Sequence, residues 1–150
     1  MAGIDAFAQT DLIQTSAVKL TLLQLVAAAN HRVKVQGFSI SFQGVVNTDS
    51  PLQVELVRQS TAGTMTALTC IANDESIDET LQTTAQHTAT VEPTEPANSV
   101  IVREFVHPQG GFTYQSMFAK EILIGGGNRL GMVVTASVDI PCVCRFFFEE

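Results

Sequence analysis

Apolar residues recur at every second position over much of the chain, and this alternation restricts the possible fold more than any other feature. In "LQVELVRQS" the pattern puts Leu52, Val54 and Leu56 on one face, and in "IPCVCRFFFEE" it puts Phe146 and Phe148 on one face. A period of two is typical of a β-strand with one buried face. The stretch "AVKLTLLQLVAAA" also reads as a strand, although its Ala and Leu content would suit a helix. The pattern predicts an all-β fold without a long helix.

The alternation changes phase at Gly37. Val33 and Val35 are apolar at odd positions, whereas Phe38 and Ile40 are apolar at even positions. One extra residue in a strand resets the pleat in this way, and glycine is common where a strand kinks. We expect a β-bulge at Gly37.

About eight strands follow one another at short spacing, with long excursions between some of them and no internal repeat or linker. This spacing predicts a single all-β domain, an eight-stranded jelly-roll sandwich over residues 16–150. Residues 1–15 contain isolated apolar residues, Ile4, Phe7 and Leu12, but too little pattern for a core strand. We expect them to form an extended N-terminal arm, since a terminus is poorly ordered unless something ties it down.

The charge content indicates a protein partner. Charged residues make up 15% of the chain, against about 25% in a typical soluble domain. A low share of charged residues is expected where part of the surface faces another protein. The net charge is −7 and the basic residues are scattered singly, so nucleic-acid binding is not expected. No apolar run is long enough for a membrane span, and no secretory signal is visible at the start.

The glycine-rich stretch "GGGN" is predicted to be a turn. It precedes a strand and no Lys-Ser or Lys-Thr pair follows, so it does not match a phosphate-binding loop. Leu130 occupies the place of the last glycine in a dinucleotide fingerprint.

Residues that could carry catalysis or bind a metal do not form a recognisable site. The three histidines lack the paired spacing of a metal strand, and the acidic stretch 72–84 lacks the order of a calcium loop. Cys142 and Cys144 share a face with Phe146 and Phe148, which predicts buried free thiols. We therefore expect no catalytic residue, cofactor or metal ion, and a structural or binding role.

Three stretches, "ANHRVKVQGFSISFQG", "VREFVHPQGGFTYQ" and "EILIGGGNRLGMVVTAS", resemble those of small head proteins of tailed bacteriophages. The resemblance is to capsid decoration, or cement, proteins with a jelly-roll core, and it covers about residues 15–150. It implies a homotrimer on the outer surface of the virion capsid, at local three-fold positions. Such a trimer would join neighbouring subunits of the major capsid protein and stabilise the shell. No catalytic residue is implied.

Five apolar or aromatic side chains are the candidates for contacts with the capsid or with another subunit: Ile4, Phe7, Leu12, Phe112 and Tyr114. Tyr114 with Phe112 and Phe118 could instead stack on a sugar, although such residues more often pack beneath a loop or at a subunit interface. The alternative function is accordingly a sugar- or receptor-binding jelly roll, such as a fibre tip or lectin. Aromatic residues grouped on one exposed loop would favour that alternative.

Overall fold

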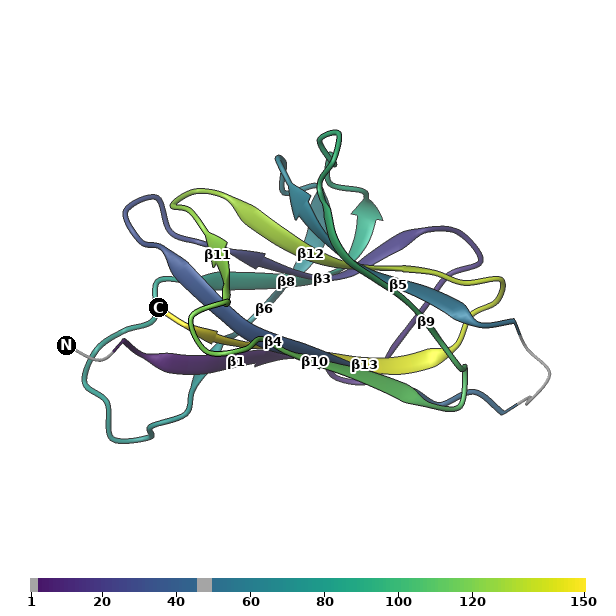
Figure 1. Ribbon diagram of the computed structural model, residues 1–150, viewed down its shortest axis with the longest axis horizontal. Coiled ribbons are helices and arrows are strands. Elements are labelled where there is room, and N and C mark those ends of the chain that lie inside the picture. The colour runs from purple at the N-terminus through teal and green to yellow at the C-terminus, as the bar shows by residue number, and fades with distance from the viewer. Residues whose placement is uncertain (1–2, 46–49) are drawn as a thin grey trace.

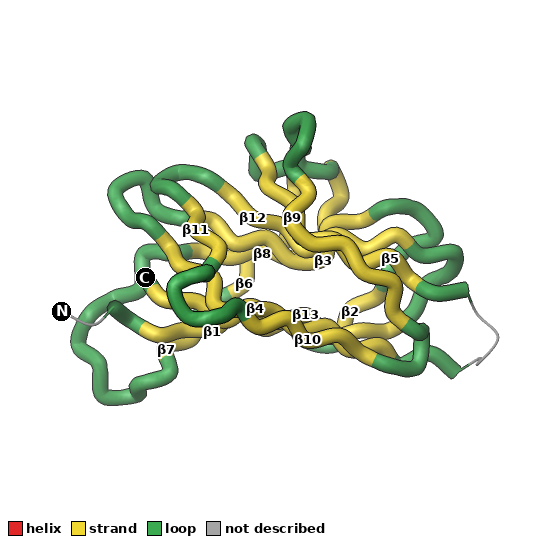
Figure 2. The backbone as a smooth tube through the Cα atoms, viewed as in Figure 1, coloured by secondary structure: helices red, strands yellow, loops and turns green. Residues whose placement is uncertain are grey.

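The protein is a sandwich of two antiparallel β-sheets (Figures 1 and 2). The computed structural model describes residues 3–45 and 50–150, in which there are thirteen strands and no helix. Sheet A has seven strands: β1 (Asp5–Gln9), β2 (Ile13–Gln14), β4 (Val33–Phe42), β7 (Ile71–Ala72), β10 (Gly111–Gln115), β11 (Ile122–Ile124) and β13 (Pro141–Glu149). Sheet B has six strands: β3 (Leu20–Val26), β5 (Leu52–Gln59), β6 (Thr64–Leu68), β8 (Thr84–Val91), β9 (Val100–Val106) and β12 (Arg129–Thr135).

The chain passes repeatedly from one sheet to the other. The main path of sheet A runs in the order β10-β4-β13-β1-β7, and sheet B runs in the order β6-β8-β3-β12-β5-β9. β3, β4 and β5 lie alternately in sheets B, A and B, and β12 and β13 lie in opposite sheets. Successive strands therefore contribute inward-facing side chains to both sides of one core.

The core between the sheets is made by the alternating positions. Phe38, Phe146 and Phe148 of sheet A are fully buried, and so are Leu56 and Met132 of sheet B. Burying a side chain of this size stabilises the fold by about 1.5–3 kcal/mol. The predicted all-β fold is confirmed, and the segment that could have been a helix is strand β3.

The predicted bulge lies where the sequence places it. Phe147 of β13 pairs with Gly37 and the next residue, Phe148, pairs with Val35, so Gln36 is the extra residue in β4. The φ angle of Gly37 is not positive, so the glycine is needed for another reason. A Cβ atom at this position would overlap the carbonyl oxygen of Tyr114 in the neighbouring strand β10. Gly37 thus allows a close approach of two backbones.

The "GGGN" stretch is a turn, as predicted. The Asn128 N–H donates to the Gly125 carbonyl at 3.0 Å, and Gly127 has a φ of +76°. Glycine adopts this left-handed conformation without the steric penalty that other residues meet. The turn carries the chain from β11 in sheet A to β12 in sheet B.

The outer face of sheet B is covered by the chain itself. Val57 and Val133 point away from the central core, yet both are fully buried. The two ends of the excursion between β5 and β9 contact this face. The Glu92 carboxylate accepts from the Thr21 N–H at 2.9 Å and from the Thr21 hydroxyl at 2.6 Å, and the Thr61 carbonyl accepts from the Gln24 amide at 3.2 Å. In Figure 1 the loops at the two ends of this excursion project from the upper sheet, whereas β7 and the loop after it lie beside the lower sheet. The outer face of sheet A has no comparable cover within the described part of the chain, and its side chains are partly exposed.

Two expectations need correction. The described residues form thirteen strands, against the expected eight, because strands as short as β2 and β7 contain too few residues to show alternation. The expected arm over residues 1–15 is also wrong: β1 pairs with β13 along its whole length, and β2 pairs with β13 as well. The inward residues of β1 are Ala6 and Ala8, whose small side chains give only a weak hydrophobic pattern.

Candidate binding surfaces

The three candidate contact residues near the N-terminus lie in different environments. Ile4 is buried, Phe7 lies half-buried on the outer face of sheet A, and Leu12 is 61% exposed in the connection between β1 and β2. They do not form one patch. Ile4 and Phe7 belong to the sandwich, and of the three only Leu12 is free to meet a partner with most of its surface.

The two aromatic candidates on β10 pack against the core. The ring of Tyr114 stacks on Phe38 with a centroid distance of 5.6 Å, and Phe112 meets the same ring at 5.8 Å. Phe118, in contrast, is 96% exposed on the loop that follows β10. The three aromatic residues therefore do not form the exposed group that a sugar-binding loop would require.

A largely apolar surface lies along one side of the sandwich. β9 and β10 are the terminal strands of their two sheets, and a short turn at 107–110 joins them. Figures 1 and 2 show them one above the other, nearest the viewer. We call β9, β10 and the loop 116–121 the β9–β10 edge.

The β9–β10 edge exposes several large apolar side chains. Phe105 on β9 is 69% exposed, and Met117 is 75% exposed on the loop beside Phe118. Exposed strand edges in natural proteins are usually protected by charges, prolines or bulges, because their free backbone groups can pair with another chain. β9 has one bulge, at Ile101, and two charges, of which Arg103 is bound to Glu55 through Nε at 3.1 Å and Nη2 at 2.8 Å. The exposed side chains of Phe105, Met117 and Phe118, rather than the free backbone of β9, make this edge suited to contact with another protein.

A second surface lies on the outer face of sheet A. The strand registers align Ile71, Phe7, Phe147, Gly37 and Gln115 in one row across five strands. Because Gly37 has no side chain, the row has a gap between Phe147 and Gln115. The gap forms a hollow of about 230 Å³.

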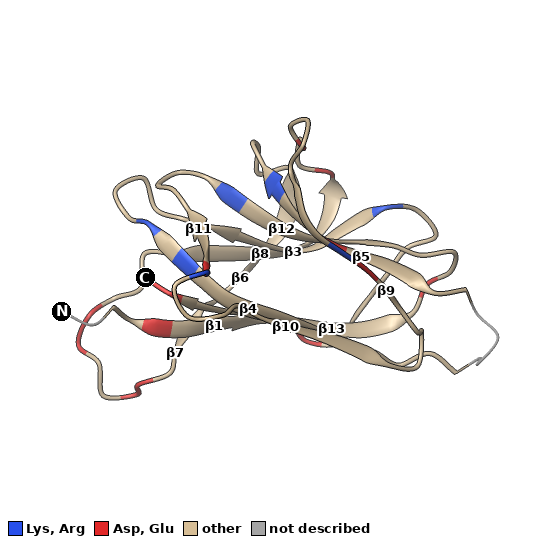
Figure 3. Cartoon of the chain, viewed as in Figure 1, with Lys and Arg blue, Asp and Glu red and all other residues tan. Residues whose placement is uncertain are grey.

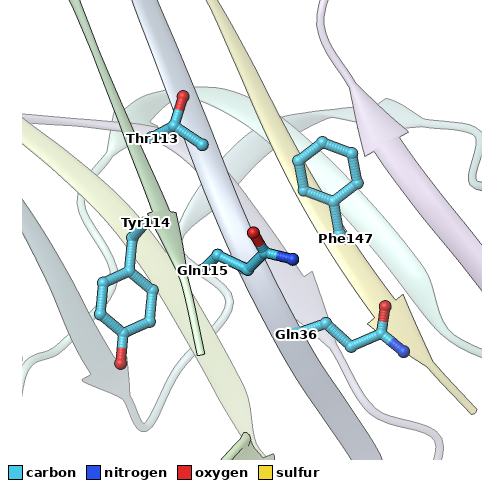
Figure 4. A pocket seen from close by; sticks show the side chains of 6 residues that line it. Gln36, Thr113, Tyr114, Gln115 and Phe147 are labelled. Carbon is cyan, nitrogen blue, oxygen red and sulfur yellow. The ribbon is translucent and has the colours of Figure 1, made fainter. Parts of the chain in front are cut away.

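Side chains of both kinds line this hollow. Figure 4 shows the Phe147 ring opposite Thr113 and Gln115, and the amide of Gln36 lies below Phe147 in this view. The Tyr114 ring points away, toward the core, and contributes only its backbone (Figure 4). This hollow was not predicted from the sequence, although the alternation in β13 already places Val143, Arg145 and Phe147 on the face opposite Cys142.

Glu150 has a structural role at one end of the sandwich. Its carboxylate accepts hydrogen bonds from the N–H groups of Gln82 and Thr83 and from the Thr83 hydroxyl, and His31 Nδ1 lies 3.9 Å away. Burial alone would raise the pKa of Glu150, but the hydrogen bonds from Thr83 and Gln82 and the nearby His31 together lower it. A cavity of about 500 Å³ lies beside it, lined also by Gly3 and His31. The carboxylate ties the segment before β8 to the end of β13.

The described residues bring together no group of three His, Cys, Asp or Glu side chains that could bind a metal ion. Cys142 and Cys144 are free and fully buried, as predicted. Burial is the main cause that raises the pKa of Cys144, helped by its hydrogen bond to Cys142, and burial raises that of Cys70 to about 11. Such thiols are poor nucleophiles and poor metal ligands. No helix long and apolar enough to cross a membrane occurs in residues 3–45 and 50–150.

The chain matches no protein-family model, no curated protein and no solved structure.

Proposed function

We propose that the protein is a structural subunit of a phage virion that decorates and stabilises the outer surface of the capsid. In this proposal it acts as a homotrimer at local three-fold sites and bridges subunits of the major capsid protein. The observation that carries the proposal is the exposed apolar surface of the β9–β10 edge, with Phe105, Met117 and Phe118. Large apolar side chains exposed together on one surface often mark a protein-binding site. The resemblance of three sequence stretches to decoration proteins names the kind of partner.

We also propose that the sandwich is a jelly roll with an insertion. In a jelly roll the first strand pairs with the last, and the two antiparallel sheets form from two interleaved Greek keys. The pairings of β13 with β1 and β4, and of β12 with β3 and β5, agree with that connectivity. The insertion would be residues 60–99, which hold β6, β7 and β8. The eight strands of the proposed jelly roll are β1, β3, β4, β5, β9, β10, β12 and β13.

Binding would stabilise the capsid by mass action. A subunit that binds only the assembled shell shifts the equilibrium away from the dissociated shell, in proportion to its affinity and concentration. A trimer adds to this effect because its second and third contacts are intramolecular once the first has formed. Each buried Å² of apolar surface contributes about 25 cal/mol before the costs of association are subtracted.

The proposal is tested by a capsid-binding titration. Expanded capsids without decoration are mixed with increasing amounts of protein, and the bound fraction is read by sedimentation. We expect saturation at a multiple of three copies per site and a higher melting temperature of the capsid. Protein that stays in the supernatant at every concentration would overturn the decoration function.

Paired variants test the β9–β10 edge. Phe105→Ser and Phe118→Ser remove exposed apolar surface and should weaken capsid binding without loss of the fold. Val18→Ser is the matched control, since Val18 is 65% exposed in the turn before β3. Equal binding by all three variants would show that capsid contact does not use this edge.

The second candidate function is sugar binding, and the hollow beside Phe147 is the observation that favours it. An aromatic ring with nearby amide and hydroxyl groups can stack on a pyranose ring and bind its hydroxyls. Ligand-observed NMR with a panel of mono- and oligosaccharides tests this function. Signal transfer that is lost in Phe147→Leu would support sugar binding, and absence of transfer for every sugar would exclude it at this hollow.

A further inference from the structure

The outer face of sheet A holds a guanidinium group against two aromatic rings. The Cζ atom of Arg145 lies 4.5 Å from the centre of the Phe7 ring and 4.6 Å from that of the Phe147 ring. Stacking on aromatic faces attracts the cation and restricts the planar group. The N–H donors of Arg145 therefore keep a defined direction without help from a carboxylate.

Arg145 has no anionic partner in the described part of the chain. No carboxylate lies within 4.0 Å of it, whereas Lys19 pairs with Glu95 and Lys34 pairs with Glu149. Its Nε atom is buried and makes no hydrogen bond with any described residue. Arginine flanked by aromatic rings is typical of the residues that contribute most to protein contacts, and its preferred partner is a carboxylate.

Carboxylates without a basic partner are present elsewhere on the molecule. Residues 73–83 connect β7 to β8 and carry four exposed acidic side chains, Asp74, Glu75, Asp78 and Glu79. None of them forms an ion pair with a residue that the structure describes. In Figure 3 this loop, at the lower left, carries acidic residues and no basic ones.

The loop and Arg145 do not pair within one copy. The loop leaves the sheet beside Asp5, since the Asn73 N–H donates to the Asp5 carbonyl at 2.8 Å. The Arg145 guanidinium stacks instead on Phe7 and Phe147, and no loop carboxylate lies within 4.0 Å of it among the described residues. A second copy of the chain can supply the carboxylate that the first copy does not.

We propose that Arg145 of one copy binds a carboxylate from residues 73–83 of a second copy, and that this contact joins the subunits of the trimer. The inference rests on the self-association in the proposed function. The two surfaces are different, so the contact is heterologous and repeats around a ring until the ring closes. Phe7 and Phe147 shield the ion pair from water, which strengthens it relative to an exposed pair. The exposed side chain of Ile71, beside Phe7 in the same row, extends the apolar border of the site.

Sedimentation velocity of the full chain tests this contact at low and at high salt. Arg145→Gln should weaken trimer formation about tenfold or more, and so should replacement of Glu75, Asp78 and Glu79 by their amides. Arg32→Gln is the matched control, because it makes the same change in net charge at an exposed arginine and should leave the trimer intact. Circular dichroism melting verifies that each variant is folded.

A charge exchange gives the decisive result. Arg145→Glu alone should prevent assembly, and Arg145→Glu together with Glu75→Lys, Asp78→Lys and Glu79→Lys should restore it. A trimer that Arg145→Gln leaves unchanged would overturn this inference and leave the capsid-binding proposal standing. A wild-type chain that is monomeric at every concentration would instead overturn self-association itself.

Discussion

Replacing Gly37 by alanine tests the close approach of β4 and β10. The added Cβ atom would overlap the Tyr114 carbonyl oxygen and lie 3.3 Å from the Cα atom of Gln115. Both are backbone atoms of a paired strand, so a side-chain rotation cannot relieve the overlap. The end of β10 must move away from β4.

The expected loss follows from what that movement breaks. The hydrogen bonds at risk run from the Ser116 N–H and from the Ser116 hydroxyl to the Gln36 carbonyl, both at 2.8 Å. Each contributes about 0.5–1.5 kcal/mol net. The lower entropy of the unfolded alanine chain offsets about 0.4–1 kcal/mol of the loss. The variant should lose about 1–2 kcal/mol, which for a chain of this length lowers the melting temperature by roughly 2–8 °C.

Thermal and urea unfolding, followed by circular dichroism, measure this loss. Gly110→Ala is the control, because a Cβ atom there would lie 3.5 Å from the His107 carbonyl oxygen, an ordinary contact. The control should unfold within about 0.5 kcal/mol of the parent. If the two alanine variants unfold alike, the backbones do not approach as closely as the structure indicates.

Three further changes have defined outcomes. Glu150→Gln should destabilise the protein by about 1–2 kcal/mol near pH 7, since hydrogen bonds to a charged group are lost. The folded pKa of Glu150 is below its ordinary value of 4.5. The stability difference between the parent and Glu150→Gln should therefore persist above pH 4.5 and vanish as the pH falls through the lower, folded pKa. Urea titrations at several pH values measure this difference. At pH 8 the native thiols of Cys70 and Cys144 should react slowly with a disulfide reagent and rapidly after unfolding, since burial raises both pKa values; fast native reaction would mean that these thiols are accessible. Deletion of residues 1–12 removes β1 and should unfold the domain or lower its melting temperature by more than about 10 °C, because a whole strand and its buried alanines are lost; an unchanged circular dichroism melt would mean that β1 is dispensable.

The sheets and the bulge could be predicted because their signals are local. Phe38 and Ile40 differ in phase from Val33 and Val35, and only one extra residue can reconcile the two phases in one strand. The alternation of apolar residues does not explain why position 37 is glycine. That reason lies in Tyr114, which is far away in the sequence and meets Gly37 only through the pairing of β4 with β10.

The strand at the N-terminus could not be predicted because its stabilising contacts are made by other strands. Ala6 and Ala8 are buried between partners on β13 and in the core, but alanine itself carries little hydrophobic signal. The packing of the aromatic candidates could not be predicted for a related reason. Phe112 and Tyr114 alternate correctly for a strand, yet the sequence does not indicate that Phe38 lies beneath both rings.

The unequal cover of the two sheets limits where partners can bind. Residues near Thr61 and Glu92 contact the outer face of sheet B, where Val57 and Val133 are fully buried. The exposed surfaces are the outer face of sheet A, with Arg145 and its aromatic neighbours, the acidic loop 73–83 and the β9–β10 edge. Arg145 and the loop are charged, whereas the β9–β10 edge presents apolar side chains. A subunit that binds its own copies through charges and a capsid through apolar side chains keeps the two contacts separate, so salt weakens the first while the second persists. At high salt, capsid binding should therefore lose its multiple-of-three stoichiometry. The affinity of each single copy for the capsid, through the β9–β10 edge, should stay the same.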